Sequence, residues 1–172
     1  MRDLPEPVWT RFVRDRAVLS VLVVLLVALA VMVALLVRGG DAADSTDQAA
    51  AEAAALKAAR TSAVSMTSYD YRRLDTDFAW ADDAATESFA RQYRDANKPL
   101  RGVITKLKAT ARGSVVASAA TAKGPRKVQV VMFIDQRVTN RADGDKRSDK
   151  SRVVMSMVER DGRWLVDDVD LR

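Results

Sequence analysis

The stretch from Lys127 to Thr139 reads KVQVVMFIDQRVT, and apolar residues recur at every second position over most of its length. Successive side chains of an extended strand point to opposite faces, so these positions share one face. They are Val128, Val130, Met132, Ile134 and Val138, whereas Val131 and Phe133 fall on the other face. The stretch therefore predicts a strand with one face in the core of the protein.

Neighbouring runs continue this alternation and predict a four-stranded antiparallel sheet. The predicted strands are Ser114–Ala122, Lys127–Thr139, Ser151–Arg160 and Arg163–Leu171. Asp161-Gly162 predicts a type I′ turn between the last two strands, because both central residues of that turn need a positive φ. Gly124-Pro125 turns the first hairpin, and the charged segment Asn140–Lys150 is typical of a solvated loop.

The residues before the sheet favour helices. Half of residues 42–63 are alanine, and neither proline nor glycine interrupts them, which predicts a helix. This helix is either the first helix of the folded domain or a stalk that pairs with a neighbouring subunit. Thr67 and Ser68 then resemble the caps of a second helix, whose apolar positions run from Tyr71 to Ala81.

A third, longer amphipathic segment starts between Asp82 and Thr86 and runs to Leu107. Pro99 lies inside it and predicts either a kink or a break into two helices. Gly113 follows as a helix stop or a strand entry. Three helices followed by an antiparallel meander predict an α+β domain with the helices packed on one face of a curved sheet.

Residues 17–37 form an apolar run in which Ser20 alone is polar. A helix of 21 residues rises about 31 Å, which matches the hydrocarbon core of a bilayer. Four arginines precede the run and only Arg38 follows closely, so the N-terminus is expected in the cytoplasm. A cleaved signal peptide is the alternative, but its apolar region is shorter and ends at a small-residue cleavage site.

This topology predicts a single-pass protein of the plasma (inner) membrane with four parts. They are a cytoplasmic N-terminus (1–16), a transmembrane helix (17–37), a linker with the alanine-rich helix (38–66) and an extracytoplasmic domain (67–172). The net charge of +5 is spread over the chain rather than concentrated in one part. We therefore do not expect nucleic acid to be a partner.

The absence of cysteine and histidine excludes disulfides, Cys/His metal sites and the nucleophilic mechanisms that depend on these residues. Nucleophile-elbow, P-loop and dinucleotide-binding motifs are absent as well. Asp143-Gly144-Asp145 falls short of a calcium loop, because Arg147 stands at the next ligand position. We predict no catalytic residues, no cofactor and no metal.

Two sets of residues are candidates for contacts with other molecules. On a continuous helix, a basic stripe would meet an acidic partner or anionic lipid headgroups, and it consists of Arg91, Arg94, Lys98, Arg101, Lys108 and Arg112. A cavity between helices and sheet would hold a lipid chain among the aromatic residues Tyr71, Phe78, Trp80, Phe89, Tyr93 and Trp164. A solvated helix face and core packing are the alternative interpretations.

Features in a characteristic order extend over residues 17–172. They are the anchor, the alanine-rich helix, Tyr69-Asp70-Tyr71 with Leu74-Asp75, Phe89 with Tyr93, Gly113, and the closing Asp161-Gly162-Arg163-Trp164-Leu165-Val166. This order resembles the Mce-associated membrane proteins of actinobacteria. One departure is Thr86-Glu87-Ser88, where a glycine often precedes the Phe89-like position in that family.

The resemblance implies a cone-shaped, NTF2-like fold, similar to VirB8-like periplasmic domains. It also implies a non-catalytic accessory or stabilising subunit of an Mce-type lipid-import complex, with Mce proteins and a permease as partners. One alternative is a VirB8-like scaffold of a secretion or conjugation channel. A second is a membrane-tethered NTF2-like enzyme with Asp75 or Asp77 as base and Tyr71 or Tyr93 as oxyanion donor.

Overall fold

A computed structural model describes residues 29–32, 45–142 and 144–171 of the chain. The chain divides into two units, residues 1–46 and 47–172. In the first unit the described residues, 29–32 and 45–46, are helical. Apart from residues 29–32, the predicted cytoplasmic segment 1–16 and transmembrane helix 17–37 lie outside the described residues. Within the described residues, no helix has both the length and the apolar character that a membrane span requires.

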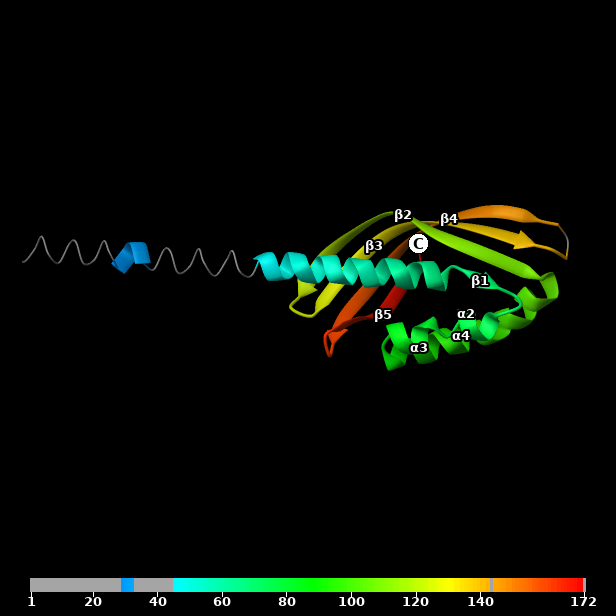
Figure 1. Ribbon diagram of the computed structural model, residues 1–172, viewed down its shortest axis with the longest axis horizontal. Coiled ribbons are helices and arrows are strands. Elements are labelled where there is room, and N and C mark those ends of the chain that lie inside the picture. Colours follow the sequence, from blue (N-terminus) through cyan, green and yellow to red (C-terminus); the bar gives the residue numbers. More distant parts are fainter. Residues whose placement is uncertain (1–28, 33–44, 143, 172) are drawn as a thin grey trace, which may run out of the picture. The chain divides into compact units, whose positions relative to one another are not determined.

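The second unit is an α+β domain in which helices precede a curled antiparallel sheet (Figure 1). An alanine-rich helix of residues 45–66 leads into it. The following elements are β1 (Tyr69–Asp70), α2 (Leu74–Asp77), α3 (Trp80–Ala84), α4 (Glu87–Leu107), β2 (Ala109–Gly124), β3 (Lys127–Asn140), β4 (Lys146–Arg160) and β5 (Arg163–Leu171). The strand order is β1-β2-β3-β4-β5, so the sheet is a meander with one strand more than predicted.

The additional strand lies where the sequence predicts the start of a helix. Thr67 and Ser68 end the alanine-rich helix instead of capping a new one, because the Thr67 hydroxyl donates to the Ala63 carbonyl (2.6 Å). The Ser68 hydroxyl accepts the backbone N–H of Gly113 (3.0 Å), which brings the chain to the edge of β2. β1 then pairs with β2, and the predicted second helix is replaced by the short helices α2 and α3.

Two strands are longer than their sequence patterns predict. β2 starts at Ala109, so Gly113 lies within the strand rather than before it. A Cβ at Gly113 would stand 1.8 Å from the Thr67 hydroxyl oxygen, which explains why glycine occupies this position. β4 starts at Lys146, and the predicted loop Asn140–Lys150 is correspondingly short. The first five residues of β4 are all exposed and mostly charged, so they carry no apolar alternation for a sequence pattern to detect, whereas the start of β2 alternates only through the small residues Ala109 and Ala111.

The predicted turn between β4 and β5 is confirmed. Asp161 and Gly162 both have positive φ angles, of 51° and 72°. Arg160 pairs with Arg163 across this turn, as a two-residue hairpin requires.

Helix α4 is continuous across Pro99, so the predicted break into two helices does not form. The Thr86 side chain caps the first turn by accepting the backbone N–H of Phe89, and Lys108 ends the helix in the left-handed conformation (φ 48°). Pro99 lies on an exposed side of the helix, where water can replace the amide donor that proline lacks.

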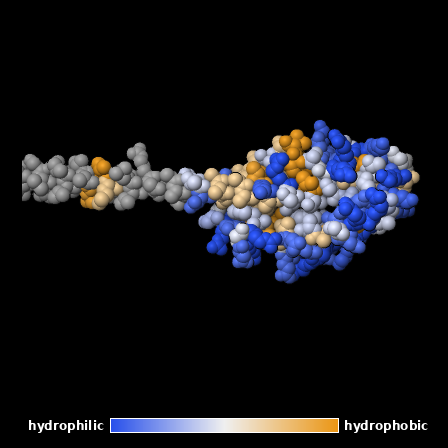
Figure 2. Space-filling model, in the orientation of Figure 1, coloured by the Kyte–Doolittle hydropathy of each residue, from blue (hydrophilic) through white to orange (hydrophobic). Residues whose placement is uncertain are grey.

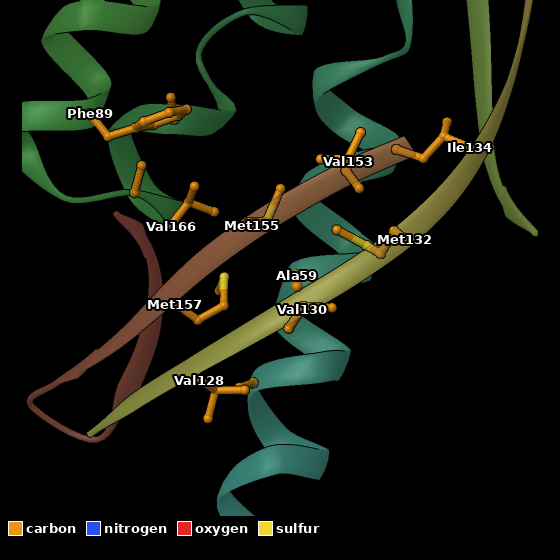
Figure 3. Packing of buried hydrophobic residues seen from close by; sticks show 14 of the residues in the cluster. Ala59, Phe89, Val128, Val130, Met132, Ile134, Val153, Met155, Met157 and Val166 are labelled. Carbon is orange, nitrogen blue, oxygen red and sulfur yellow. The ribbon is translucent and has the colours of Figure 1, made fainter. Parts of the chain in front are cut away.

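The core lies between one face of the sheet and the helices (Figure 3). The predicted apolar face of β3 is buried as expected, with Val130 and Met132 fully inaccessible. Met155 and Met157 of β4 lie beside them and are also buried. The alanine-rich helix contributes Ala55, Ala59 and Ala63, each 0% exposed, whose small side chains allow the helix backbone to lie close to the strands. None of the helices that the structure describes within residues 47–171 covers the opposite face of the sheet (Figure 1).

Candidate interaction surfaces

Four of the predicted aromatic residues form one cluster between the helices and the sheet. Tyr93 lies at its centre, with ring centroids 5.0 Å from Trp80 and 6.2 Å from both Phe78 and Phe89. Burial raises the pKa of the Tyr93 phenol above its usual value. The rings pack against one another at the distances typical of aromatic pairs in protein cores.

The other two predicted aromatic residues lie apart from this cluster. Trp164 is on β5 and packs, partly buried, against the main hydrophobic core. Tyr71 follows β1, and the guanidinium of Arg72 lies 5.6 Å from the centre of its ring. The structure therefore does not bring all six aromatic residues around one space.

A cavity of about 380 Å³ lies next to the aromatic cluster. Its apolar lining comes mainly from α4 and includes Leu100, Val103, Ile104 and Leu107. Phe78 is the residue of the predicted aromatic set that reaches it, and Tyr69, which the sequence patterns did not single out, lines it as well. Burial raises the pKa of Tyr69. The spacing of the α4 residues signals an apolar helix face, but their spacing gives no sign that a cavity adjoins it.

The predicted basic stripe is split by the end of α4. Lys108 is the residue that ends the helix, and Arg112 lies on β2, so these two do not extend a helical stripe. The four residues on the helix each form an ion pair with an acidic neighbour. The pairs are Arg91 with Glu87, Arg94 with Asp82, Lys98 with Asp95, and Arg101 with Asp75. Exposed pairs such as these add little to stability, but they neutralise the helix surface.

Both acids considered as catalytic bases are engaged in ion pairs. The side chain of Asp75 is 98% exposed and pairs with Arg101. Asp77 accepts the backbone N–H of Asp70 (2.7 Å) and lies 3.5 Å from Arg73. Asp75 is thus open to solvent, whereas the Asp77 side chain is only 14% exposed but is already held by the Asp70 amide and by Arg73. Among the described residues, no group of three acidic side chains is placed to hold a metal ion.

Comparison with known proteins identifies the family. Residues 15–171 match the family described as "Uncharacterized protein Rv1363c/MT1408-like". The chain belongs to this family. Protein Rv1362c of Mycobacterium tuberculosis H37Rv is 31% identical over 124 residues, which cover 70% of this chain and 55% of that protein. The chain therefore matches little more than half the length of this relative.

Two solved structures of bacterial proteins, one of them from a type IV secretion system, share the fold of this Rv1363c/MT1408-like protein. The periplasmic domain of DotI superposes with a TM-score of 0.60 at 12% identity, covering 70% of this chain and 94% of that structure. CagV, a VirB8 homolog of the type IV secretion system of Helicobacter pylori, gives 0.55 at 15% identity, covering 70% and 97%. The predicted VirB8-like and NTF2-like fold is confirmed, whereas the association with Mce transporters stays a prediction.

Proposed function

We propose that the protein is a non-catalytic, membrane-anchored scaffold, whose domain joins other proteins into an assembly of the cell envelope. The observation that carries this proposal is the fold, which is shared with the periplasmic domain of DotI and with CagV of a type IV secretion system. Both acids considered as bases are ion-paired, Asp75 with Arg101 and Asp77 with Arg73, and this supports a non-catalytic role because neither carboxylate is held free for proton transfer.

The anchor in this proposal is the apolar segment 17–37, with the domain outside the cytoplasm. The chain has no cysteine, so single-cysteine variants report topology directly. In intact cells, a membrane-impermeant maleimide should label Lys123→Cys, at an exposed turn, but label Thr10→Cys only after lysis. Equal labelling of both variants in intact cells would contradict the proposed topology.

Two assemblies are candidates for the scaffold. The structural neighbours favour a secretion or conjugation channel, in which the protein would act like VirB8. The order of sequence features favours an accessory subunit of an Mce-type lipid-import complex. Both candidates use the same anchor and domain, and they differ in the proteins that are bound.

Purification of the tagged full-length protein from its native membrane in mild detergent, followed by quantitative mass spectrometry, tests the proposal. A tagged, unrelated single-pass protein serves as the control for nonspecific recovery. Enrichment of secretion-channel components supports the first assembly, and enrichment of Mce proteins with a permease supports the second. If no protein is enriched above the control, the scaffold proposal is wrong.

A further inference from the structure

The sheet face opposite the helices carries a concentration of positive charge at one end. Arg112 on β2 and Arg137 on β3 are direct cross-strand partners, and Lys146 on β4 is paired with Thr139 on β3. Arg141 begins the short turn that follows β3. All four basic residues are exposed. We call Arg112, Arg137, Arg141 and Lys146 the distal basic cluster.

The cluster is electrostatically unfavourable in the isolated domain. Like charges directly opposite each other in an antiparallel pair destabilise a sheet, and Arg112 faces Arg137 in this way. Within the part of the chain that the structure describes, no carboxylate lies within ion-pair distance of any of the four residues. Asp135 shares their face, but it is placed opposite Lys150 in the register.

The acids of the adjoining pocket do not neutralise the cluster either. This pocket has a volume of about 520 Å³, and Arg112 and Arg141 line it together with two other arginines and two aspartates. Asp70 accepts from the Arg72 Nε atom (2.9 Å), and Asp77 pairs with Arg73. Each of these two aspartates is therefore already engaged, so neither neutralises Arg112 or Arg141.

The position of the cluster favours a protein over the membrane surface as its partner. Thr67, just beyond the end of the alanine-rich helix, lies against Gly113 on β2. Residues 47–66 of this helix span about 30 Å, so the cluster is about one helix length from the start of the domain. Figure 1 shows the β3–β4 turn at the opposite end of the domain from the start of this helix.

We propose that the distal basic cluster binds an acidic segment of a partner protein. Arginine side chains suit this role because their planar guanidinium groups bind carboxylates through two parallel hydrogen bonds. Phe133, 53% exposed, lies farther along the same face, and Val116, 64% exposed, lies beside it in the bulge of β2, so both offer apolar contacts near the charges. Figure 2 shows hydrophilic surface at this end of the domain and a hydrophobic area over the middle of the strands. This inference rests on the scaffold function and names its contact surface.

The test compares the full-length protein with the double variant R112E/R137E in the same affinity purification. K123E/R126E is the matched control, because it makes the same change in charge at exposed positions at the other end of the sheet. We expect R112E/R137E to lower partner recovery by at least about tenfold, and the control to leave it within about twofold. Recovery of the partner by the unmodified protein should also fall as salt concentration rises.

A single variant separates binding from folding. R137E places a glutamate opposite Arg112, which replaces a like-charge pair by an opposite-charge pair. We expect this variant to keep or raise the melting temperature while it loses partner recovery. A loss of recovery that accompanies a lowered melting temperature in R137E would show a folding effect and contradict the inference.

The outcomes also distinguish this inference from the scaffold proposal. If the unmodified protein enriches no partner, the scaffold proposal itself fails. If partners are enriched and R112E/R137E recovers them equally well, the cluster is not the contact surface and the scaffold proposal stands. If the variant instead loses only co-purified anionic lipid, the cluster binds membrane headgroups and the inference of an acidic protein segment is wrong.

Discussion

The two faces of the sheet are made by neighbouring residues of the same strands, yet they differ in burial and in charge. On β3, Met132 is fully buried against the helices, while Phe133, the next residue, is 53% exposed on the opposite face. The buried face holds the domain together through apolar packing. The open face carries charge and exposed apolar groups that the fold does not need. Stability and binding should therefore be separable by mutation.

The largest expected effect comes from a substitution on the buried face. Met132→Ala removes a fully buried side chain from the core and should lower the free energy of unfolding by about 2–5 kcal/mol. Phe133→Ala, one residue away, should cost less than about 1 kcal/mol because its side chain is largely exposed. Urea unfolding of both variants measures the difference. Equal losses would mean that both faces support the fold.

Gly113 gives the next effect, since it lies on β2 directly against Thr67 at the end of the alanine-rich helix. Gly113→Ala places a methyl group against Thr67 and should cost about 1–3 kcal/mol of unfolding free energy. Gly102→Ala on α4 is the control, because no atom lies within 4 Å of its added methyl group. A helical alanine is favoured over glycine by about 1 kcal/mol, so this variant should be stabilised. The two glycines are thus expected to respond with opposite signs.

The buried face was largely predictable from sequence, whereas the start of the sheet was not. The alternation in β3 and the Asp161-Gly162 turn are local signals, and the structure bears both out. Ser68 carries the same local signal as a helix cap, but its hydroxyl is used by Gly113, 45 residues away. The residues around Ser68 give no indication of a hydrogen bond to a residue so distant in the sequence.

The charged surfaces show a similar limit. The sequence reveals the basic residues of α4, but not that Asp75 and Asp82, on other elements, lie close enough to neutralise Arg101 and Arg94. Conversely, the opposition of Arg112 and Arg137 depends on the register of β2 against β3. The sequence pattern could have placed Arg112 opposite Arg137 only if the first predicted strand had begun before Gly113.

The edge of the sheet offers a smaller and more local test. Glu52 of the alanine-rich helix accepts the backbone N–H of Ala122 on β2 (2.8 Å), so the helix satisfies a donor of this edge strand. Glu52→Ala should cost about 1 kcal/mol and increase the hydrogen exchange of the Ala122 amide. Glu52→Gln retains an acceptor oxygen and should lose less. Equal exchange in the two variants would show that water replaces the carboxylate at no cost.

The smallest effect concerns pH and lies beside the distal basic cluster. Hydrogen bonds from Arg72 hold the pKa of Asp70 well below its usual value. A carboxyl with a lowered pKa in the folded state stabilises the protein above its unfolded pKa of about 4. This contribution is lost as the pH falls below that value toward the folded pKa.

Asp70→Asn should therefore reduce the loss of stability below pH 4. At pH 7 this variant should change stability little, apart from the loss of the ion pair with Arg72. Thermal unfolding over a range of pH measures both effects. Asp95→Asn on α4 is a control, because Asp95 also has a lowered pKa, through Lys98, but lies away from the cluster. At neutral pH, Asp70→Asn also releases the charge of Arg72 next to Arg112 and Arg141, which line the same pocket. If the cluster binds acidic segments, partner recovery should rise in Asp70→Asn and stay constant in Asp95→Asn. Only Asp70→Asn leaves an additional arginine without its acidic partner on the binding surface.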